Sequence, residues 1–345
     1  MPDSTRYGRR EVLKACGVAG ATVGVAGCLG GDGDITWRYT HEHSDNHNVG
    51  IAANDFAERV EDETDAISEV EVFGSSELGG IDEQVEGVSD GSIDIGHGDY
   101  AAVASMHRPA FVFNTPFIYE DTDHQMDALD GRDSPVVEEV NEGLTDEANV
   151  RFVGYWYYGR RMLTANQRIE HPDDLDGLLI RGVPNEMWLA MVRGMGAQPE
   201  PVEFSELPGA LATGVVDGQE NPLDTIVDNG LYENQSHVML TAHMRAPVSV
   251  YVNENSWQEL SGEDQDTVYD ILSDLSQDTV DRGLETEDEL LEYLQDDEGT
   301  TVVGSGELGT EVELNREDFR EPVQEEVEDE FEDLIPMMDE IRDLA

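Results

Sequence analysis

The amino-acid sequence predicts an α/β fold with two lobes that share one long helix. Strand-like and helix-like segments alternate from residue 35 to about residue 96, and a second run of the same kind begins near residue 160. Alternation at this spacing favours parallel strands joined by right-handed crossovers. Residues 257–294 keep helical apolar spacing over an unusual length, so this helix is suited to brace two lobes across a hinge.

Each element of the first run is predicted from the spacing of its apolar residues. Residues 35–39 alternate apolar and polar side chains as strands do, and residues 49–63 place Ile51, Phe56 and Val60 on one helical face. The same criteria give strands at 67–73, 93–96, 151–157 and 162–166, and helices at 81–88, 120–129 and 134–144.

The second run follows the same pattern. Residues 172–177 are expected to form a helical turn that ends at a glycine. Strands are predicted at 178–181, 201–204, 237–241 and 248–252, and helices at 185–195 and 206–216. Gly283 is a candidate kink in the long helix, and the tail at 315–345 has a helical pattern and is expected to pack back on the body.

The charge balance is extreme, because 78 Asp and Glu residues accompany 18 Arg and a single Lys, for a net charge of −59. At molar salt the Debye length is about 3 Å, so repulsion among the carboxylates is screened. The composition therefore predicts a halophile's protein. A disordered acidic chain is incompatible with 38% hydrophobic residues in regular periods. Nucleic acid is excluded as a partner because its phosphates would be repelled.

Residues 1–33 are predicted to be an export signal, a lipidation site and a tether. Arg9 and Arg10 stand in a twin-arginine pattern, and the apolar stretch after them is too short to span a bilayer. Residues 25–28 (VAGC) resemble a lipobox, so Cys28 is expected to anchor the protein by lipid to the extracytoplasmic face of the cell membrane. The alternative is that Cys28 is an ordinary small residue of a signal segment. No disulfide is expected, because Cys16 would be removed.

Two arginines and an asparagine are the first candidates for ligand contact. Arg161 and Arg181 stand twenty residues apart, and Asn221 follows in the block 217–222 (DGQENP). The planar fork of Arg matches a carboxylate with two hydrogen bonds, so this pair suggests a carboxylate site. The alternative for each Arg is a structural ion pair with one of the many acids.

Several segments carry a family resemblance: 75–80 (SSELGG), 90–94 (DGSID), 159–161 (GRR), 171–181 (HPDDLDGLLIR), 195–199 (MGAQP), 203–207 (EFSEL), 210–222 (ALATGVVDGQENP) and 257–260 (WQEL). Together they cover most of residues 35–275 and resemble the substrate-binding proteins of TRAP transporters. The resemblance implies a two-lobed fold, similar to that of periplasmic binding proteins, with crossing hinge strands. It implies a division into lobe I (34–158 plus about 247–285) and lobe II (159–246 plus about 286–345).

The resemblance also implies roles for individual residues. Arg181 would grip the carboxylate of a small organic acid, with Arg161 as a second arginine and Asn221 as a polar contact. Phe204 aligns with an apolar wall of the cleft. Asp99 lies where some members of the family contact the ligand with an acid or a polar group. Each of these residues also has a plain structural alternative, such as packing, ion pairing or turn formation.

The histidine-rich segment 41–47 superficially resembles a set of metal ligands, through His41, His43 and His47. A metal site needs a specific cage of ligands and not merely a high density of histidines. We therefore expect this segment to line the mouth of the cleft, with no metal and no other cofactor. Trp188 is expected in the core and not stacked on a ligand.

These features together predict a lipid-anchored receptor that captures a small organic acid and delivers it to one large and one small TRAP membrane subunit. No catalytic residue is predicted, because the sequence has no Gly-x-Ser-x-Gly or His-Glu-x-x-His motif and no free cysteine is expected in the mature chain. An exported enzyme and a sensory binding protein on the same scaffold are the alternatives, and the identity of the acid stays open.

Overall fold

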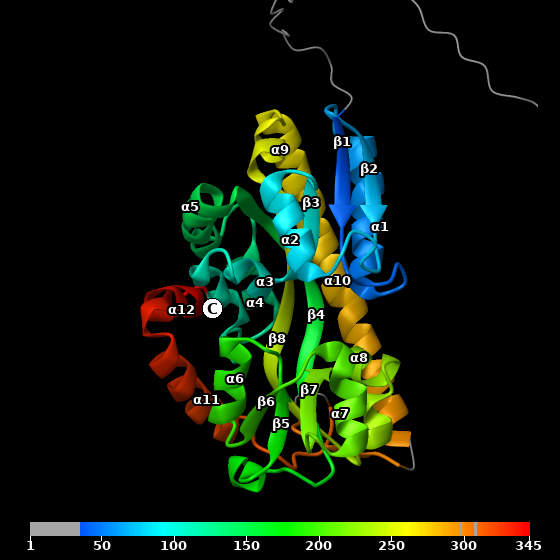
Figure 1. Ribbon diagram of the computed structural model, residues 1–345, viewed down its shortest axis with the longest axis vertical. Helices are drawn as coiled ribbons and strands as arrows, with labels where there is room; N and C mark the ends of the chain where they lie inside the picture. Colours follow the sequence, from blue (N-terminus) through cyan, green and yellow to red (C-terminus); the bar gives the residue numbers. More distant parts are fainter. Residues whose placement is uncertain (1–34, 297–298, 307–308) are drawn as a thin grey trace, which may run out of the picture. The chain divides into compact units, whose positions relative to one another are not determined.

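A nine-stranded mixed sheet organises the chain (Figure 1). The computed structural model describes residues 35–296, 299–306 and 309–345. Its strands follow the order β2-β1-β3-β8-β4-β7-β5-β6, with β9 (Thr301–Val303) beside β8. This sheet and its many helices confirm the α/β class. The predicted export signal at Arg9 and Arg10 and the predicted lipidation site at Cys28 lie outside the described residues.

One half of the sheet is built from three parallel strands. β1 (Ile35–Thr40) pairs with both β2 (Ile67–Phe73) and β3 (Ile95–Asp99), and the crossovers contain α1 (Asn48–Glu63) and α2 (Ile81–Asp90). The periodicity of the sequence therefore placed these elements correctly, although β3 begins two residues later than predicted. Parallel strands point the same way, so their carboxyl ends lie at one edge of the sheet.

The other half repeats this arrangement. β5 (Leu179–Gly182) lies between β6 (Gln198–Pro201) and β7 (Gly218–Pro222), again in parallel, with α6 (Glu186–Gly194) and α7 (Leu207–Thr213) as the intervening helices.

Two predictions for this second half were wrong. The strand expected at 201–204 is β6, which ends at Pro201, so that Phe204 stands in a short 3₁₀ turn (Phe204–Glu206) beyond it. β7 was not predicted as a strand at all. It contains four polar or glycine residues and gives no alternating pattern, but it is buried throughout, because β4 and β5 cover both of its edges.

Two long antiparallel strands, β4 (Val150–Ala165) and β8 (His237–Asn253), connect the halves (Figure 1). β8 pairs with β3 in the first half, and β4 pairs with β7 in the second. The prediction of two separate strands in place of each of them was wrong. The pairing register shifts between Tyr157 and Gly159, where Gly159 has a φ of +118°. A bulge of this kind lets a strand continue where its alternation fails.

The predicted bracing helix is α10 (Gly262–Asp296), which packs along β4, α1 and α8 (Leu223–Asp228). It continues through Gly283, the candidate kink. A Cβ atom on Gly283 would lie 2.6 Å from Cδ1 of Tyr157, so the glycine makes room for this ring against the hinge strand.

The remaining helices cover the faces and ends of the sheet: α3 (Tyr100–Ala104), α4 (Thr122–Leu129), α5 (Pro135–Ala148), α9 (Glu254–Gln258), α11 (Glu317–Glu330) and α12 (Ile335–Arg342). α11 packs on α6, which confirms that the acidic tail returns to the body.

The described residues fold as part of one compact unit, so the division into two lobes stays a prediction. Across residues 35–296, 299–306 and 309–345, every helix is too short or too polar to cross a bilayer.

Candidate functional site

A cavity of about 540 Å³ lies where the carboxyl ends of parallel strands from both halves of the sheet meet. It is lined by Glu42, His43, Ser76, Asp99, Tyr158, Arg161, Arg181, Val183, Trp188, Glu203, Phe204, Ser205, Asn221 and Thr225. Open α/β sheets bind ligands at this edge. The volume lies within the range of about 300–1,000 Å³ that is usual for small-molecule sites.

All five residues predicted to contact the ligand line this cavity, namely Arg181, Arg161, Asn221, Phe204 and Asp99. β3 supplies Asp99, β4 supplies Arg161, β5 supplies Arg181, and β7 supplies Asn221. The sheet therefore brings together residues that are far apart in the sequence. Their contact with a ligand stays a prediction.

Arg181 places a buried guanidinium at the cavity. The residue is only 2% exposed, and its Nε donates to the carbonyl oxygen of Val202 at 2.9 Å. Among the described residues, no acid forms an ion pair with it. Burial lowers the pKa of Arg181 to about 10, opposed by Glu220, so the side chain keeps its charge at neutral pH. A buried charge of this kind is costly until an opposite charge meets it.

Arg161, in contrast, already has a carboxylate partner. Its Nε donates to Oε2 of Glu220 at 2.5 Å, and its terminal NH2 donates to Oε1 at 2.9 Å. Burial opposes ionisation of Glu220, but Arg161 and His243 outweigh it and lower the pKa of Glu220 to about 2. The structural ion pair that the sequence analysis left open for Arg161 is therefore present.

A hydrogen-bonded chain holds this pair in place from behind. Nε2 of His243 donates to Oε2 of Glu220 at 3.1 Å, because an ionised carboxylate only accepts. Nδ1 of His243 then accepts from the hydroxyl of Thr241 at 2.8 Å. His243, Glu220 and Thr241 are all fully buried, so the position of Arg161 in the wall is fixed.

Asn221 extends the same network toward the cavity. Its Oδ1 accepts from Arg161 at 2.9 Å, and its Nδ2 donates to Oε1 of Gln219 at 2.6 Å. The amide is therefore held in one orientation by protein contacts, and it presents a fixed polar surface to the cavity.

Asp99 faces these residues from the first half of the sheet. It ends β3 and caps α3, with its Oδ1 accepting from the backbone N–H of Ala101 at 2.7 Å. Burial raises the pKa of Asp99 to about 6, although the bond from Ala101 and the charge of Arg161 both oppose the shift. Asp99 therefore changes its charge within the range of physiological pH.

Apolar side chains form the remaining wall. Trp188 is 1% exposed and belongs to the core, as predicted, but it also lines the cavity, where its ring lies 5.7 Å from Cζ of Arg161. Phe204 is 43% exposed, which is unusual for a large apolar residue in this chain.

Glu42 and His43 line the cavity from the segment 41–47, which was expected at the mouth of the cleft. Further lining residues were not predicted: Ser76, Tyr158, Val183, Glu203, Ser205 and Thr225. Most lie within two or three residues of a predicted contact or inside a segment that carries the family resemblance, and this proximity is the signal that could have identified them.

Histidines gather beside the cavity. His41 and His43 follow β1, and His97 lies in β3. Nδ1 of His43 lies 3.2 Å from Nε2 of His97, and the rings of His41 and His97 stack with centroids 4.6 Å apart. Burial and the neighbouring imidazoles lower the pKa of His43 and His97 well below the usual range. The sequence pattern drew His47, and not His97, into the group with His41 and His43, and no metal was expected there.

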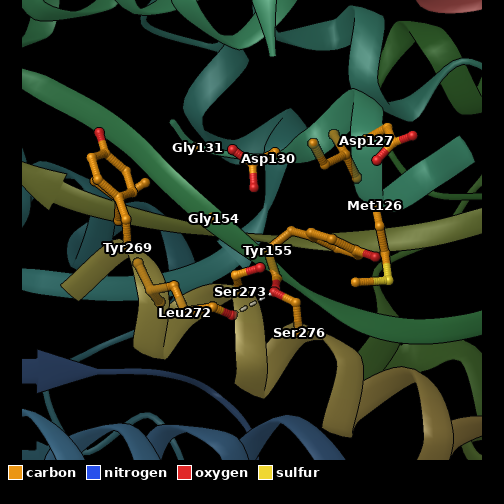
Figure 2. A pocket seen from close by; sticks show the side chains of 12 residues that line it. Met126, Asp127, Asp130, Gly131, Gly154, Tyr155, Tyr269, Leu272, Ser273 and Ser276 are labelled. Carbon is orange, nitrogen blue, oxygen red and sulfur yellow. Dashed lines mark hydrogen bonds between the residues drawn. The ribbon is translucent and has the colours of Figure 1, made fainter. Parts of the chain in front are cut away.

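A second cavity, of about 90 Å³, lies between α10, β4 and the end of α4 (Figure 2). Figure 2 shows Tyr269, Leu272 and Ser276 of α10 facing Gly154 and Tyr155 of β4. A volume of this size corresponds to roughly three water molecules at about 30 Å³ each. It is much smaller than the 540 Å³ cavity, and none of the predicted ligand contacts lines it.

Comparison with known proteins identifies the family of the chain. The model of the family described as "Bacterial extracellular solute-binding protein, family 7" (DctP) matches residues 39–333. The ectoine-binding periplasmic protein TeaA of Halomonas elongata is 30% identical over 68% of each chain. The C4-dicarboxylate-binding periplasmic protein DctP of Vibrio cholerae is 27% identical over 74% of this chain and 75% of the relative.

A solved structure shows the same fold. A TRAP periplasmic solute-binding protein from Roseobacter denitrificans, crystallised with bound 3-deoxy-D-manno-oct-2-ulosonic acid, aligns with a TM-score of 0.78 at 25% identity. The alignment covers 90% of this chain and 100% of that structure. The chain therefore belongs to the DctP family of TRAP solute-binding proteins, family 7 of the bacterial extracellular solute-binding proteins.

Proposed function

We propose that this protein is the receptor of a TRAP-type transporter, that it holds a small organic acid in the 540 Å³ cavity, and that it delivers this acid to membrane subunits. Proteins of this family bind solutes outside the cytoplasm, work with membrane subunits and are not enzymes. Relatives are named for C4-dicarboxylates and sialic acid, and a solved relative carries 3-deoxy-D-manno-oct-2-ulosonic acid. Organic acids are therefore the ligand class that the comparisons favour.

The single observation that carries the proposal is the state of Arg181. Its Nε is held by the carbonyl of Val202, which fixes the guanidinium plane, while an acid partner is lacking among the described residues. A ligand carboxylate would accept two parallel hydrogen bonds from this fixed fork and would supply the missing negative charge. The unpaired guanidinium is thus a preorganised anion site in a cavity of the right size.

The charges around the cavity narrow the class of acid. Glu220 already forms an ion pair with Arg161. Among the described residues that line the cavity, Arg181 is therefore the arginine whose charge can pair with a ligand. Asp99 lies on the opposite wall and would repel a second carboxylate, but it can accept from a hydroxyl or an amine. We therefore propose an acid with one carboxylate and with polar groups at its other end.

Ligand capture is proposed to close the two halves of the sheet over the cavity. β4 and β8 cross between the halves, and the pairing of these strands is irregular at Tyr157–Gly159 and at Arg161–Leu163. Hinges are a few positions that absorb large backbone changes, and an interrupted ladder opposes such changes less than a regular one. This hinge separates the proposed lobes at residues 158 and 159.

We also propose that the receptor is exported by the twin-arginine pathway through Arg9 and Arg10 and is held on the membrane by a lipid on Cys28. The sequence pattern supports this proposal, since the arginines, the short apolar stretch and the VAGC segment follow in the required order.

Native mass spectrometry of the full chain, purified in molar salt, tests the proposed function. A bound mass that disappears on denaturation and matches a carboxylic acid is the expected result. Titration calorimetry against mono- and dicarboxylic acids then ranks the classes, with monocarboxylates expected to bind more tightly. Chemical conversion of the bound acid on prolonged incubation would instead favour the exported enzyme.

A further inference from the structure

Three histidines converge at the carboxyl ends of two neighbouring parallel strands. β1 and β3 pair directly, with Thr40 beside Gly96, so the next residues, His41 and His97, come side by side. His43 reaches the same point from the loop after β1. One ring nitrogen from each histidine lies within 4.8 Å of the others.

The closest of these separations suits a metal ion. Nδ1 of His43 and Nε2 of His97 are 3.2 Å apart. Imidazole nitrogens bind Zn²⁺ at about 2.0–2.1 Å, so two such ligands of a tetrahedral ion are separated by roughly 3.4 Å. The two nitrogens are therefore already close to the spacing that a shared ion requires.

His41 supplies an independent observation. It is fully buried, and neither of its ring nitrogens has a hydrogen-bond partner. Buried polar groups without a partner are rare and costly in folded proteins. The His41 ring now stacks on His97 at an interplanar angle of 13°. One of its ring nitrogens already lies within 4.8 Å of ring nitrogens of His43 and His97.

A second layer of contacts orients His97. Its Nδ1 lies 3.0 Å from the hydroxyl of Tyr39, which in turn accepts from the indole Nε1 of Trp156 at 3.1 Å. Histidines that bind metals usually donate their other nitrogen to a partner that fixes the ring. Tyr39 occupies this position, and it directs Nε2 of His97 toward His43.

Negative charge accompanies the cluster. The carboxylate of Asp45 lies near His41, because both side chains pack against Gly74. A Cβ atom on Gly74 would come 2.9 Å from Cε1 of His41 and 3.0 Å from Oδ1 of Asp45. His47, in contrast, is not available. Its Nδ1 accepts from the N–H of Val49 at 3.4 Å, and its Nε2 lies 3.3 Å from the carboxylate of Asp224.

We propose that His41, His43 and His97 bind a first-row divalent transition-metal ion, with Zn²⁺ as the reference ion. Imidazole ligands suit Zn²⁺, Ni²⁺ and Cu²⁺, whereas Mg²⁺ and Ca²⁺ prefer oxygen. Three protein ligands leave one position open. His43 also lines the 540 Å³ cavity, so the proposed ion would lie beside it. The site differs from the metal-free loop that the sequence predicts, and it does not rest on the proposed function.

The test uses the metal alone on the full chain after treatment with a chelator. Calorimetric titration with ZnCl₂ is expected to give one ion per chain. His41→Ala and His43→Ala are each expected to weaken binding at least about 100-fold, since loss even of an outer contact costs about 10–100-fold. His47→Gln and the exposed His171→Gln are the matched controls, and both should bind within threefold of the parent.

Titration of the parent with Co²⁺ gives a second measurement that needs no variant. Visible absorption bands of nitrogen-ligated Co²⁺ should appear and saturate at one equivalent, and Zn²⁺ should remove them. The absence of such bands would overturn the proposal. Parent-like Zn²⁺ affinity in folded His41→Ala and His43→Ala would also overturn it, as would loss of binding in His47→Gln.

Discussion

Replacement of Arg181 by alanine should weaken ligand binding strongly while changing the stability of the free protein little, and this contrast tests the proposed site. In the ligand-bound protein, the change would leave the carboxylate of the acid buried and unpaired. Loss of one partner of such a pair costs about 2–5 kcal/mol. At about 1.4 kcal/mol per decade, we expect binding to weaken by roughly 30-fold to several thousand-fold. Arg181→Lys should recover only part of this loss, because an ammonium cannot reproduce the two-pronged contact.

The free protein should respond differently. Burial lowers the pKa of Arg181 from 12.5 to about 10. Neutral pH lies below both values, so the charged form carries the whole net penalty of this shift in the folded state, roughly 3 kcal/mol. Alanine removes this cost, but it also removes the buried stem, which contributes about 1–3 kcal/mol. The two effects oppose each other, so we expect the free energy of unfolding to change by less than about 2 kcal/mol.

Arg160 is the matched control, because it is a buried arginine of the hinge strand that does not line the cavity. It donates to Glu287 from Nε at 2.6 Å. Arg160→Ala would leave the buried Glu287 without its charged partner, although Tyr157 still donates to it, and such a loss typically costs about 3–5 kcal/mol of stability. Ligand affinity should stay within about threefold of the parent. Arg161→Ala breaks the Glu220 pair in the cavity wall, so it should reduce both stability and affinity.

Denaturant unfolding and titration calorimetry in molar salt, with the acid identified by mass spectrometry, measure the two quantities for each variant. The reasoning is refuted if Arg181→Ala binds within about threefold of the parent. It is equally refuted if Arg181→Ala loses as much stability as Arg160→Ala, because the guanidinium would then have a structural partner.

Four further predictions follow from the site, the charge and the first residues of the chain. Burial raises the pKa of Asp99 to about 6, so Asp99 becomes charged as pH rises from about 5 to 7 and should then repel an acid. Affinity for the acid should therefore fall over this range, and Asp99→Asn should flatten the dependence on pH. A rising affinity would instead point to a cationic group on the ligand. Circular dichroism along a falling KCl series should show loss of structure, because dilution to 0.1 M lengthens screening from about 3 to about 10 Å, and full native signal there would contradict the halophilic interpretation. Intact-mass measurement should show a lipidated chain that begins at Cys28, and an unmodified chain would count against the anchor. In Cys28→Ser the exported protein should be released or left uncleaved, and Arg9→Lys together with Arg10→Lys should block export. Small-angle scattering should show a smaller radius with ligand, and an unchanged radius would argue against hinge closure.

The parts of the fold that the sequence predicted are those set by local pattern. β2 has the range that was predicted for it, and α1 begins one residue before its own predicted start. The apolar periods of both elements depend only on nearby residues. β7 escaped prediction because GQENP has no strand pattern of its own. It becomes a strand through pairing with β4 and β5, and such long-range pairing leaves no local pattern in the sequence.

The candidate site shows the same division. Arg181 could be singled out because it ends a short apolar strand in a chain poor in positive charge. The histidine cluster could not, because it needs β1 and β3 as neighbours, and this adjacency skips β2 in sequence order. His97 has no other histidine near it in the sequence. His47 follows His43 by four residues, so the sequence pattern grouped it with His41 and His43.

Arg161 and Arg181 show why the sequence alone could not assign their roles. Both lie in strands, both line the cavity, and both are almost completely buried. The difference between them is Glu220, which lies fifty-nine residues after Arg161 and meets it only through the pairing of β4 with β7. Once this carboxylate is assigned, Arg161 belongs to an ion pair, whereas no acid among the described residues forms an ion pair with Arg181. We therefore predict that ligand recognition depends on Arg181 more than on Arg161.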